Sequence, residues 1–123
     1  MPWNLDSQRP IYAQIIERVQ LDIITGRYAP GSRLPSVREL AAQAAVNPNT
    51  MQKALSELES GGLIYAQRTS GRFVTEDLEK IRRAKEQLAS MQIREFIVRM
   101  KKLGLTREEI MSLFQQIIGE ETL

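Results

Sequence analysis

The sequence predicts a mostly α-helical fold with one small β-hairpin, arranged as an N-terminal winged helix-turn-helix and a two-helix C-terminal tail. Two helix-start signals, at Ser36 and Asn47, follow each other closely, as in two short helices joined by a tight turn. Two short β-type runs come next, separated by residues 68–71. A long charged segment with helical periodicity then begins near residue 77.

The first helix is predicted to run from about Pro10 to Thr25, because proline suits a first helical turn and the glycine that follows Thr25 suits a stop. One face of this segment is apolar at every fourth position: Ile11, Ile15, Val19 and Ile23. Residues 28–35 contain a proline–glycine turn and predict a tight connector with a short strand at Arg33-Leu34.

The second and third helices carry clear start signals. Ser36 and Glu39 have the spacing of a capping box, in which each side chain accepts a hydrogen bond from the other residue's backbone N–H. Asn47 is a good N-cap and Pro48 suits a first helical position, so the third helix is predicted over residues 47–60. Its buried side is predicted to consist of Met51, Ala54, Leu55 and Leu58.

Residues 63–67 and 72–74 have strand composition and are predicted to pair across a hairpin turn in which Gly71 can adopt a positive φ. This hairpin completes a winged helix-turn-helix domain over residues 1–75. Residues 76–123 are predicted to form a helical domain with one helix over residues 77–103 and a last helix that begins with the capping box of Thr106 and Glu109.

Both tail helices carry apolar stripes: Ile81, Ala84, Leu88, Met91, Ile93, Phe96, Ile97, Met100, Leu103, Ile110, Leu113, Phe114, Ile117 and Ile118. Two helices joined by a short turn cannot bury this much apolar surface between themselves. Exposed patches of this kind usually meet a partner, and the tail is too short to close a ligand-binding domain. We therefore expect a homodimer that forms through the C-terminal helices.

Composition excludes several classes of protein. The 123 residues include no cysteine and no histidine, which removes disulfides, thiolate metal sites and the commonest general base and metal ligand. No acid, base and nucleophile cluster together, which argues against an enzyme. There is no membrane-length apolar run and no secretory signal pattern, so we expect a cytoplasmic protein with no membrane segment, metal or cofactor.

The net charge of +2 lies in the first part of the chain. Residues 1–75 hold 8 Arg and Lys against 6 Asp and Glu, whereas residues 76–123 hold 9 of each. Many domains that bind no nucleic acid carry as large an excess, so the positions of the charges must decide.

A helix-turn-helix reads DNA when polar side chains near the start of its second helix reach base edges in the major groove. Asn49, Thr50, Gln52 and Lys53 are predicted to lie on the outer side of the third helix. Asn and Gln can each make two hydrogen bonds to adenine, and Lys can reach guanine or phosphate. Arg38 is placed to meet the DNA backbone. The wing offers a small basic tip for phosphate or the minor groove: Arg68, Ser70, Gly71 and Arg72.

These residues also have ordinary interpretations. Asn47 and Ser36 are helix caps in the first place, although the hydroxyl of a capping serine can also face a phosphate. Arginines at a hairpin tip can simply be solvated charges. Trp3 and Tyr12 are interpreted as packing residues. A winged helix used as a protein-docking module is the alternative from another class, and it predicts no salt-dependent DNA binding and a different protein as the partner of the C-terminal tail.

Several strings along residues 8–75 together suggest a family: Arg9-Pro10-Ile11-Tyr12-Ala13-Gln14-Ile15, Tyr28-Ala29-Pro30-Gly31, Leu34-Pro35-Ser36-Val37-Arg38-Glu39-Leu40-Ala41, Val46-Asn47-Pro48-Asn49-Thr50-Met51-Gln52-Lys53-Ala54-Leu55 and Gly71-Arg72-Phe73-Val74. In this order they resemble the GntR family of bacterial transcription regulators, and the short helical tail is similar to its YtrA subfamily. The resemblance implies a dimeric repressor that binds double-stranded operator DNA of pseudo-palindromic sequence.

The resemblance also implies roles for single residues. It places a phosphate-contacting arginine at Arg38, with Ser36 near the backbone, and the wing glycine at Gly71. The recognition-helix contacts fall on Asn47, Asn49, Thr50, Gln52 and Lys53. Pro48 and Gln52 stand where many relatives carry arginine, which lowers the positive charge of the reading face. Repressor or activator stays open, as does the signal: a small-molecule effector at the dimer interface, or the level of the protein alone.

Overall fold

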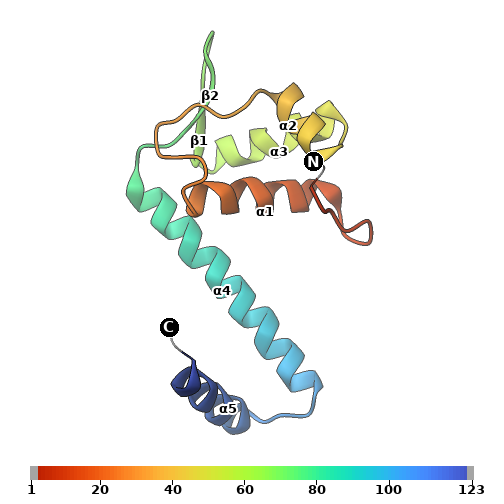
Figure 1. Cartoon of the computed structure of the whole chain (residues 1–123), viewed down its shortest axis with the longest axis vertical. Helices are drawn as coiled ribbons and strands as arrows, with labels where there is room; N and C mark the ends of the chain where they lie inside the picture. The colour runs from red at the N-terminus through yellow and green to blue at the C-terminus, as the bar shows by residue number, and fades with distance from the viewer. Residues whose placement is uncertain (1–2, 122–123) are drawn as a thin grey trace. The chain divides into compact units, whose positions relative to one another are not determined.

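The computed structural model describes residues 3–121, which form five α-helices and one two-stranded antiparallel sheet. Along the chain these are α1 (Ile11–Ile24), α2 (Val37–Ala44), α3 (Pro48–Ser60), β1 (Ile64–Gln67), β2 (Gly71–Val74), α4 (Leu78–Lys102) and α5 (Arg107–Glu120) (Figure 1). The predicted mostly helical fold with a β-hairpin wing is confirmed. The chain divides into two compact units, Met1–Lys85 and Glu86–Leu123, and their boundary lies within α4.

The core of the first unit lies between the first three helices, because α3 packs against both α1 and α2 (Figure 1). Each of these helices buries an apolar face. Ile15 of α1, Leu40 of α2 and Met51 of α3 are all 0% exposed. Burying one such side chain contributes about 1.5–3 kcal/mol relative to leaving it in water. The buried residues predicted for α3 are all confirmed as buried.

The caps predicted for α2 and α3 are confirmed. The Glu39 N–H donates to Ser36 Oγ at 3.1 Å, and the Ser36 N–H donates to Glu39 Oε1 at 3.2 Å. Asn47 Oδ1 accepts from the Asn49 N–H at 2.7 Å, so Asn47 is the N-cap and the helix itself begins at Pro48. Ala45 takes the left-handed conformation, with φ 58°, and this turns the chain sharply from α2 into α3.

The wing is a hairpin that projects away from the helices (Figure 1). β2 begins one residue earlier than predicted, because Gly71 pairs with Gln67 across the turn. The short strand predicted at Arg33-Leu34 is present as a single β-bridge between Arg33 and Phe73. Phe73 also stacks on Tyr65 of β1, with 5.7 Å between the ring centroids, and this pair stiffens the hairpin.

The segment before α1 is held against the first unit. Gln14 is 7% exposed, and its side-chain amide both accepts from the Asp6 N–H at 2.7 Å and donates to the Asp6 carbonyl at 2.6 Å. The Trp3 N–H donates to the Gln43 carbonyl at 3.1 Å, and the Arg18 guanidinium lies 4.9 Å from the centre of the Trp3 ring. Trp3 is buried, which confirms its interpretation as a packing residue.

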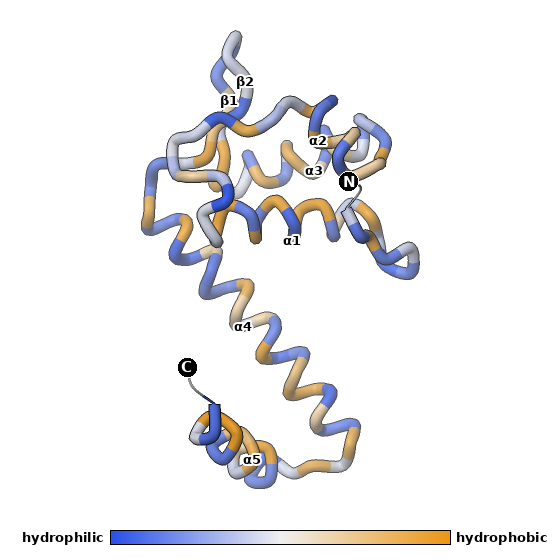
Figure 2. Tube along the Cα trace, viewed as in Figure 1, coloured by the Kyte–Doolittle hydropathy of each residue, from blue (hydrophilic) through white to orange (hydrophobic). Residues whose placement is uncertain are grey.

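The start of α4 packs with the first unit, because Ala84 is buried in its core and Ile81 packs against that core. Residues 76–85 therefore belong to the first compact unit, while the functional division after residue 75 stays a prediction. Figure 2 shows hydrophobic and hydrophilic residues alternating along α4, as in a helix with an apolar stripe. No helix within residues 3–121 is long and apolar enough to cross a membrane.

The second unit contains the rest of α4 and α5. Thr106 and Glu109 form the predicted capping box, with the Thr106 N–H donating to Glu109 Oε1 at 2.9 Å. Hydrogen bonds from the backbone and then from the side chain of Thr106 lower the pKa of the Glu109 carboxyl. Ile110 is buried, but much of the predicted apolar stripe of α5 is exposed.

Candidate nucleic-acid interface

The outer face of α3 is polar and exposed. Asn49, Gln52 and Lys53 are exposed, whereas Met51 and Leu55 on the opposite side are at most 1% exposed. This division follows from helical periodicity, because residues three or four apart share a face. The helix is therefore anchored by its apolar side, while the amide and ammonium groups of the other side are exposed to solvent.

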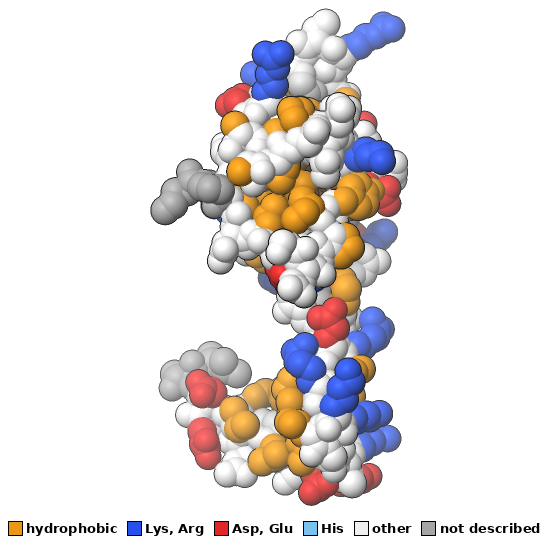
Figure 3. All heavy atoms as spheres, turned by 90° about the vertical axis from the view of Figure 1, so that its right-hand side faces the viewer, with side chains coloured by type: hydrophobic (Ala, Val, Ile, Leu, Met, Phe, Trp, Pro, Cys, Tyr) orange, Lys and Arg blue, Asp and Glu red, His pale blue; other side chains and the backbone are white. Residues whose placement is uncertain are grey.

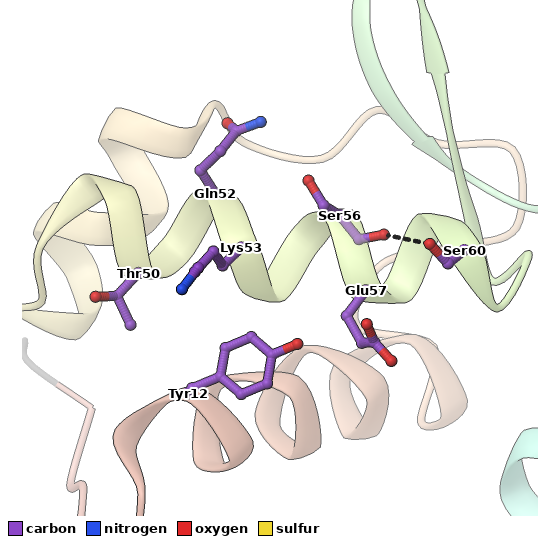
Figure 4. A pocket seen from close by; sticks show the side chains of 7 residues that line it. All are labelled: Tyr12, Thr50, Gln52, Lys53, Ser56, Glu57 and Ser60. Atoms are coloured by element: carbon purple, nitrogen blue, oxygen red, sulfur yellow. Dashed lines mark hydrogen bonds between the residues drawn. The ribbon is translucent and has the colours of Figure 1, made fainter.

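An open groove of about 580 Å³ runs beside this face, between α1 and α3 (Figure 4). Its lining residues are Tyr12, Thr50, Gln52, Lys53, Ser56, Glu57 and Ser60. Figure 4 shows the side chain of Lys53 directed toward Tyr12 of α1, and that of Gln52 pointing away from α1. Thr50 is half-buried. Among the predicted reading residues that line the groove, Gln52 thus lies at its rim and points outward, whereas Lys53 faces α1.

Tyr12 of α1 contributes to the groove, which the periodicity of α1 did not predict. It was interpreted as a packing residue, but it is 37% exposed and lines the groove. Partial desolvation, followed by the charge of Glu57 and a hydrogen bond to its carboxylate, raises the pKa of the Tyr12 hydroxyl. Tyr12 therefore interacts with Glu57 of α3 across the groove.

Residues at the two helix N-termini lie where the sequence predicted them. Ser36 and Arg38, at the start of α2, are both exposed, and so is Asn47 at the start of α3. The oxygens of Ser36 and Asn47 accept capping hydrogen bonds, so their hydroxyl and amide hydrogens can still be donated outward. The N-termini add partial positive charge, which favours an anionic ligand.

The wing arginines differ from one another. Arg68 is exposed, as are Ser70 and Gly71, and no ion pair joins Arg68 to a described residue. Arg72 instead lies 2.6 Å from Glu59 through its Nε atom, and its side chain is only 18% exposed. The structure therefore gives Arg72 a partner at the end of α3, where the sequence had suggested an open wing tip, and its DNA contact stays a prediction.

Carboxylates do not gather into a metal site within residues 3–121. The described surface around α2, α3 and the wing is polar with charges of both signs, and its exposed basic side chains include Arg38, Lys53 and Arg68. Figure 3 shows Lys or Arg side chains at the end of the first unit that carries the hairpin. Amides, hydroxyls and guanidinium groups presented from a helix and a hairpin suit base edges and phosphates.

Known proteins share both the sequence and the fold. The family model of bacterial regulatory proteins of the gntR family matches residues 11–74. The chain is 40% identical over 108 residues to the HTH-type transcriptional regulator YhcF of Bacillus subtilis, covering 88% of this chain and 89% of that protein. It is 34% identical over 115 residues to the HTH-type transcriptional repressor YtrA of the same organism, covering 93% and 88%.

Solved structures of transcription regulators are similar to this chain in fold as well as in sequence. A GntR family transcriptional regulator from Listeria monocytogenes has a TM-score of 0.82 at 39% identity, covering 91% of this chain and 98% of that one. The DNA-binding domain of AraR, in complex with operator ORX1, has a TM-score of 0.53 at 33% identity, covering 61% and 92%. The alternative of an enzyme has no support from these relatives, which are transcription regulators. From the family match and the nearly full-length similarity it follows that the chain belongs to the GntR family of bacterial regulatory proteins and is a DNA-binding transcription regulator.

Proposed function

We propose that the protein is a cytoplasmic homodimeric repressor that binds a pseudo-palindromic operator, with recognition helix 47–60 in the major groove and wing 68–72 on the adjacent backbone or minor groove. The observation that carries this proposal is the exposed amide-rich face of α3, which is held in place by a fully buried apolar face. The repressor name of YtrA and the operator complex of the AraR domain support it.

In this proposal Asn49, Gln52 and Lys53 read bases, with Asn47 and Thr50 assisting. Among these residues we favour Gln52 for a base contact, because its side chain points outward from α3, away from α1 (Figure 4). Lys53 reaches the DNA from the groove side. Ser36, Arg38 and the wing fix the position of the protein on the phosphate backbone.

The dimer is proposed to form through the second unit. Its exposed large apolar side chains are 43–73% exposed: Met91, Ile93, Val98, Leu103, Met111, Leu113, Phe114, Ile117 and Ile118. Figure 3 shows hydrophobic side chains gathered on this unit. Two copies of such a face would cover each other, and a two-fold dimer would match the symmetry of a pseudo-palindromic site. A small-molecule effector, if one acts, would bind at this interface; otherwise protein level alone would set repression.

The proposal is tested by binding of the purified protein to its own upstream promoter region, beside a scrambled duplex, from about 50 to 200 mM salt. We expect tight binding to the native fragment, a steep loss of affinity with salt and two protomers per site. Equally weak binding to both duplexes, without salt dependence, would instead favour a protein-docking role for the winged helix.

Arg38→Ala and Gln52→Ala are expected to impair binding in different ways. Loss of Arg38 should weaken binding to every sequence and reduce the salt slope by roughly 0.9, the value for one phosphate contact. Loss of Gln52 should cost about 1–3 kcal/mol mainly at its own base pair, because it removes base discrimination. Affinities for the operator and for single-base-pair variants of it, measured across the salt range, separate the two effects. Identical behaviour of both variants would contradict this division of roles.

A further inference from the structure

We infer that Arg33, in the connector between α1 and α2, is an additional contact to the DNA phosphate backbone and supplies the wing with the positive charge that Arg72 does not present. This inference rests on the proposed DNA-binding mode. Neither the sequence motifs nor the periodicity singled out Arg33, which sequence analysis placed only in a short strand.

The backbone of Arg33 is held by a third strand-like segment beside β2. The Leu34 N–H donates to the Arg72 carbonyl at 2.8 Å, and the Val74 N–H donates to the Ser32 carbonyl at 2.9 Å. Together with the bridge between Arg33 and Phe73, these bonds fix the connector along the outer edge of the wing. Arg33 therefore has a fixed backbone and belongs structurally to the wing.

The Arg33 side chain extends along the wing toward the hairpin turn. A Cβ atom on Gly71 would stand 3.1 Å from Arg33 Nε and 3.4 Å from its Nη2 atom. The guanidinium group thus covers Gly71, the first residue of β2, and the missing side chain leaves space for it. Gly71 also has φ 102°, a conformation that other residues adopt only with strain.

The positive charge of Arg33 has no ion-pair partner within the described part of the protein. Arg33 is exposed, and no described carboxylate forms an ion pair with it. Arg72, its neighbour across the backbone bonds, is paired with Glu59 at 2.6 Å. Arg68, in the turn of the same hairpin, is also exposed and adds a second positive charge to the wing, which favours the binding of an anion from outside the protein. A phosphate suits the planar guanidinium fork, which can donate two parallel hydrogen bonds.

The position of Arg33 along the chain points to the same ligand. Ser36, at the N-terminus of α2, follows three residues later, at most about 11 Å away in an extended chain. Arg33 therefore lies between two elements that the proposed function places on the DNA backbone, the wing and the start of α2. A guanidinium at this point would contact the phosphates between them.

The test compares full-length Arg33→Gln with wild type and with Arg27→Gln, which removes an exposed arginine from the segment that precedes the connector. Binding to the operator fragment and to the scrambled duplex is measured across the salt range. We expect Arg33→Gln to weaken binding to both duplexes by a similar factor, about 10-fold at low salt, and to lower the salt slope by roughly 0.9. Arg27→Gln should match wild type, and Arg33→Lys should keep the wild-type slope because it keeps the charge.

The outcomes separate this inference from the proposed function. If wild type binds with a steep salt slope and Arg33→Gln has that same slope, the contact by Arg33 is wrong and the proposed function stands. If wild type itself shows no salt-dependent binding, the proposed function fails and the inference fails with it. If Arg33→Gln also lowers the melting temperature and Arg33→Lys does not restore the salt slope, Arg33 has a structural role only, and the inference is overturned.

Discussion

Replacing Phe114 by glutamate is expected to turn the proposed dimer into a monomer and to weaken binding to the full operator by about 100- to 10,000-fold. Phe114 lies on α5 and is 49% exposed, beside the similarly exposed Ile117 and Ile118. Taking a carboxylate out of water at the centre of an apolar interface costs several kcal/mol. Operator affinity falls in turn, because the second recognition helix no longer binds at the high effective concentration that the link to the first provides.

The measurement is the molar mass in solution, by light scattering or sedimentation, together with affinity for the full operator and for a half-site. Half-site affinity should not change, because Phe114 lies outside the DNA-binding unit. Gln116→Glu is the matched control, since it adds the same charge to an exposed position of α5 that is not part of the apolar stripe. A Phe114→Glu protein that stays dimeric would contradict the assignment of this face as the interface.

Replacing Leu55 by alanine is expected to destabilise the first unit by about 2–5 kcal/mol. Leu55 is 1% exposed and lies on α3, which contacts α1, α2 and β1. The truncated side chain leaves a cavity that three elements would have to move together to fill. Small domains are stable by only about 5–15 kcal/mol, so this one change removes a large share of the total.

The control is Leu21→Ala, the same substitution at a position of α1 that is 45% exposed, where we expect a change within about 0.5 kcal/mol. Urea unfolding can be followed through the fluorescence of Trp3, the one tryptophan of the chain, which is buried in the first unit. Protein concentration must be equal in all samples, because the proposed dimerisation would couple stability to concentration. Equal losses in the two variants would show that burial is not what distinguishes these leucines.

Local features of the fold could be predicted from sequence to within about a residue. The capping boxes at Ser36 and Thr106 and the buried positions of α3 depend on residues three or four apart, so the sequence pattern contains the whole interaction. The hairpin was predicted for the same reason, since its turn and both strands are neighbours along the chain. Together with the family strings, these local signals indicated a DNA-binding regulator.

By itself, then, the sequence determined the helices, the hairpin, the apolar and polar faces of α3 and the family. Only the tertiary structure decided which of the site residues have partners. Arg72 pairs with Glu59, thirteen residues away along the chain, and Arg33 covers Gly71 from another segment. Tyr12 contacts Glu57 because α1 packs along α3. Such contacts depend on how distant elements dock and in which register, and the periodicity of a single segment contains no information on either.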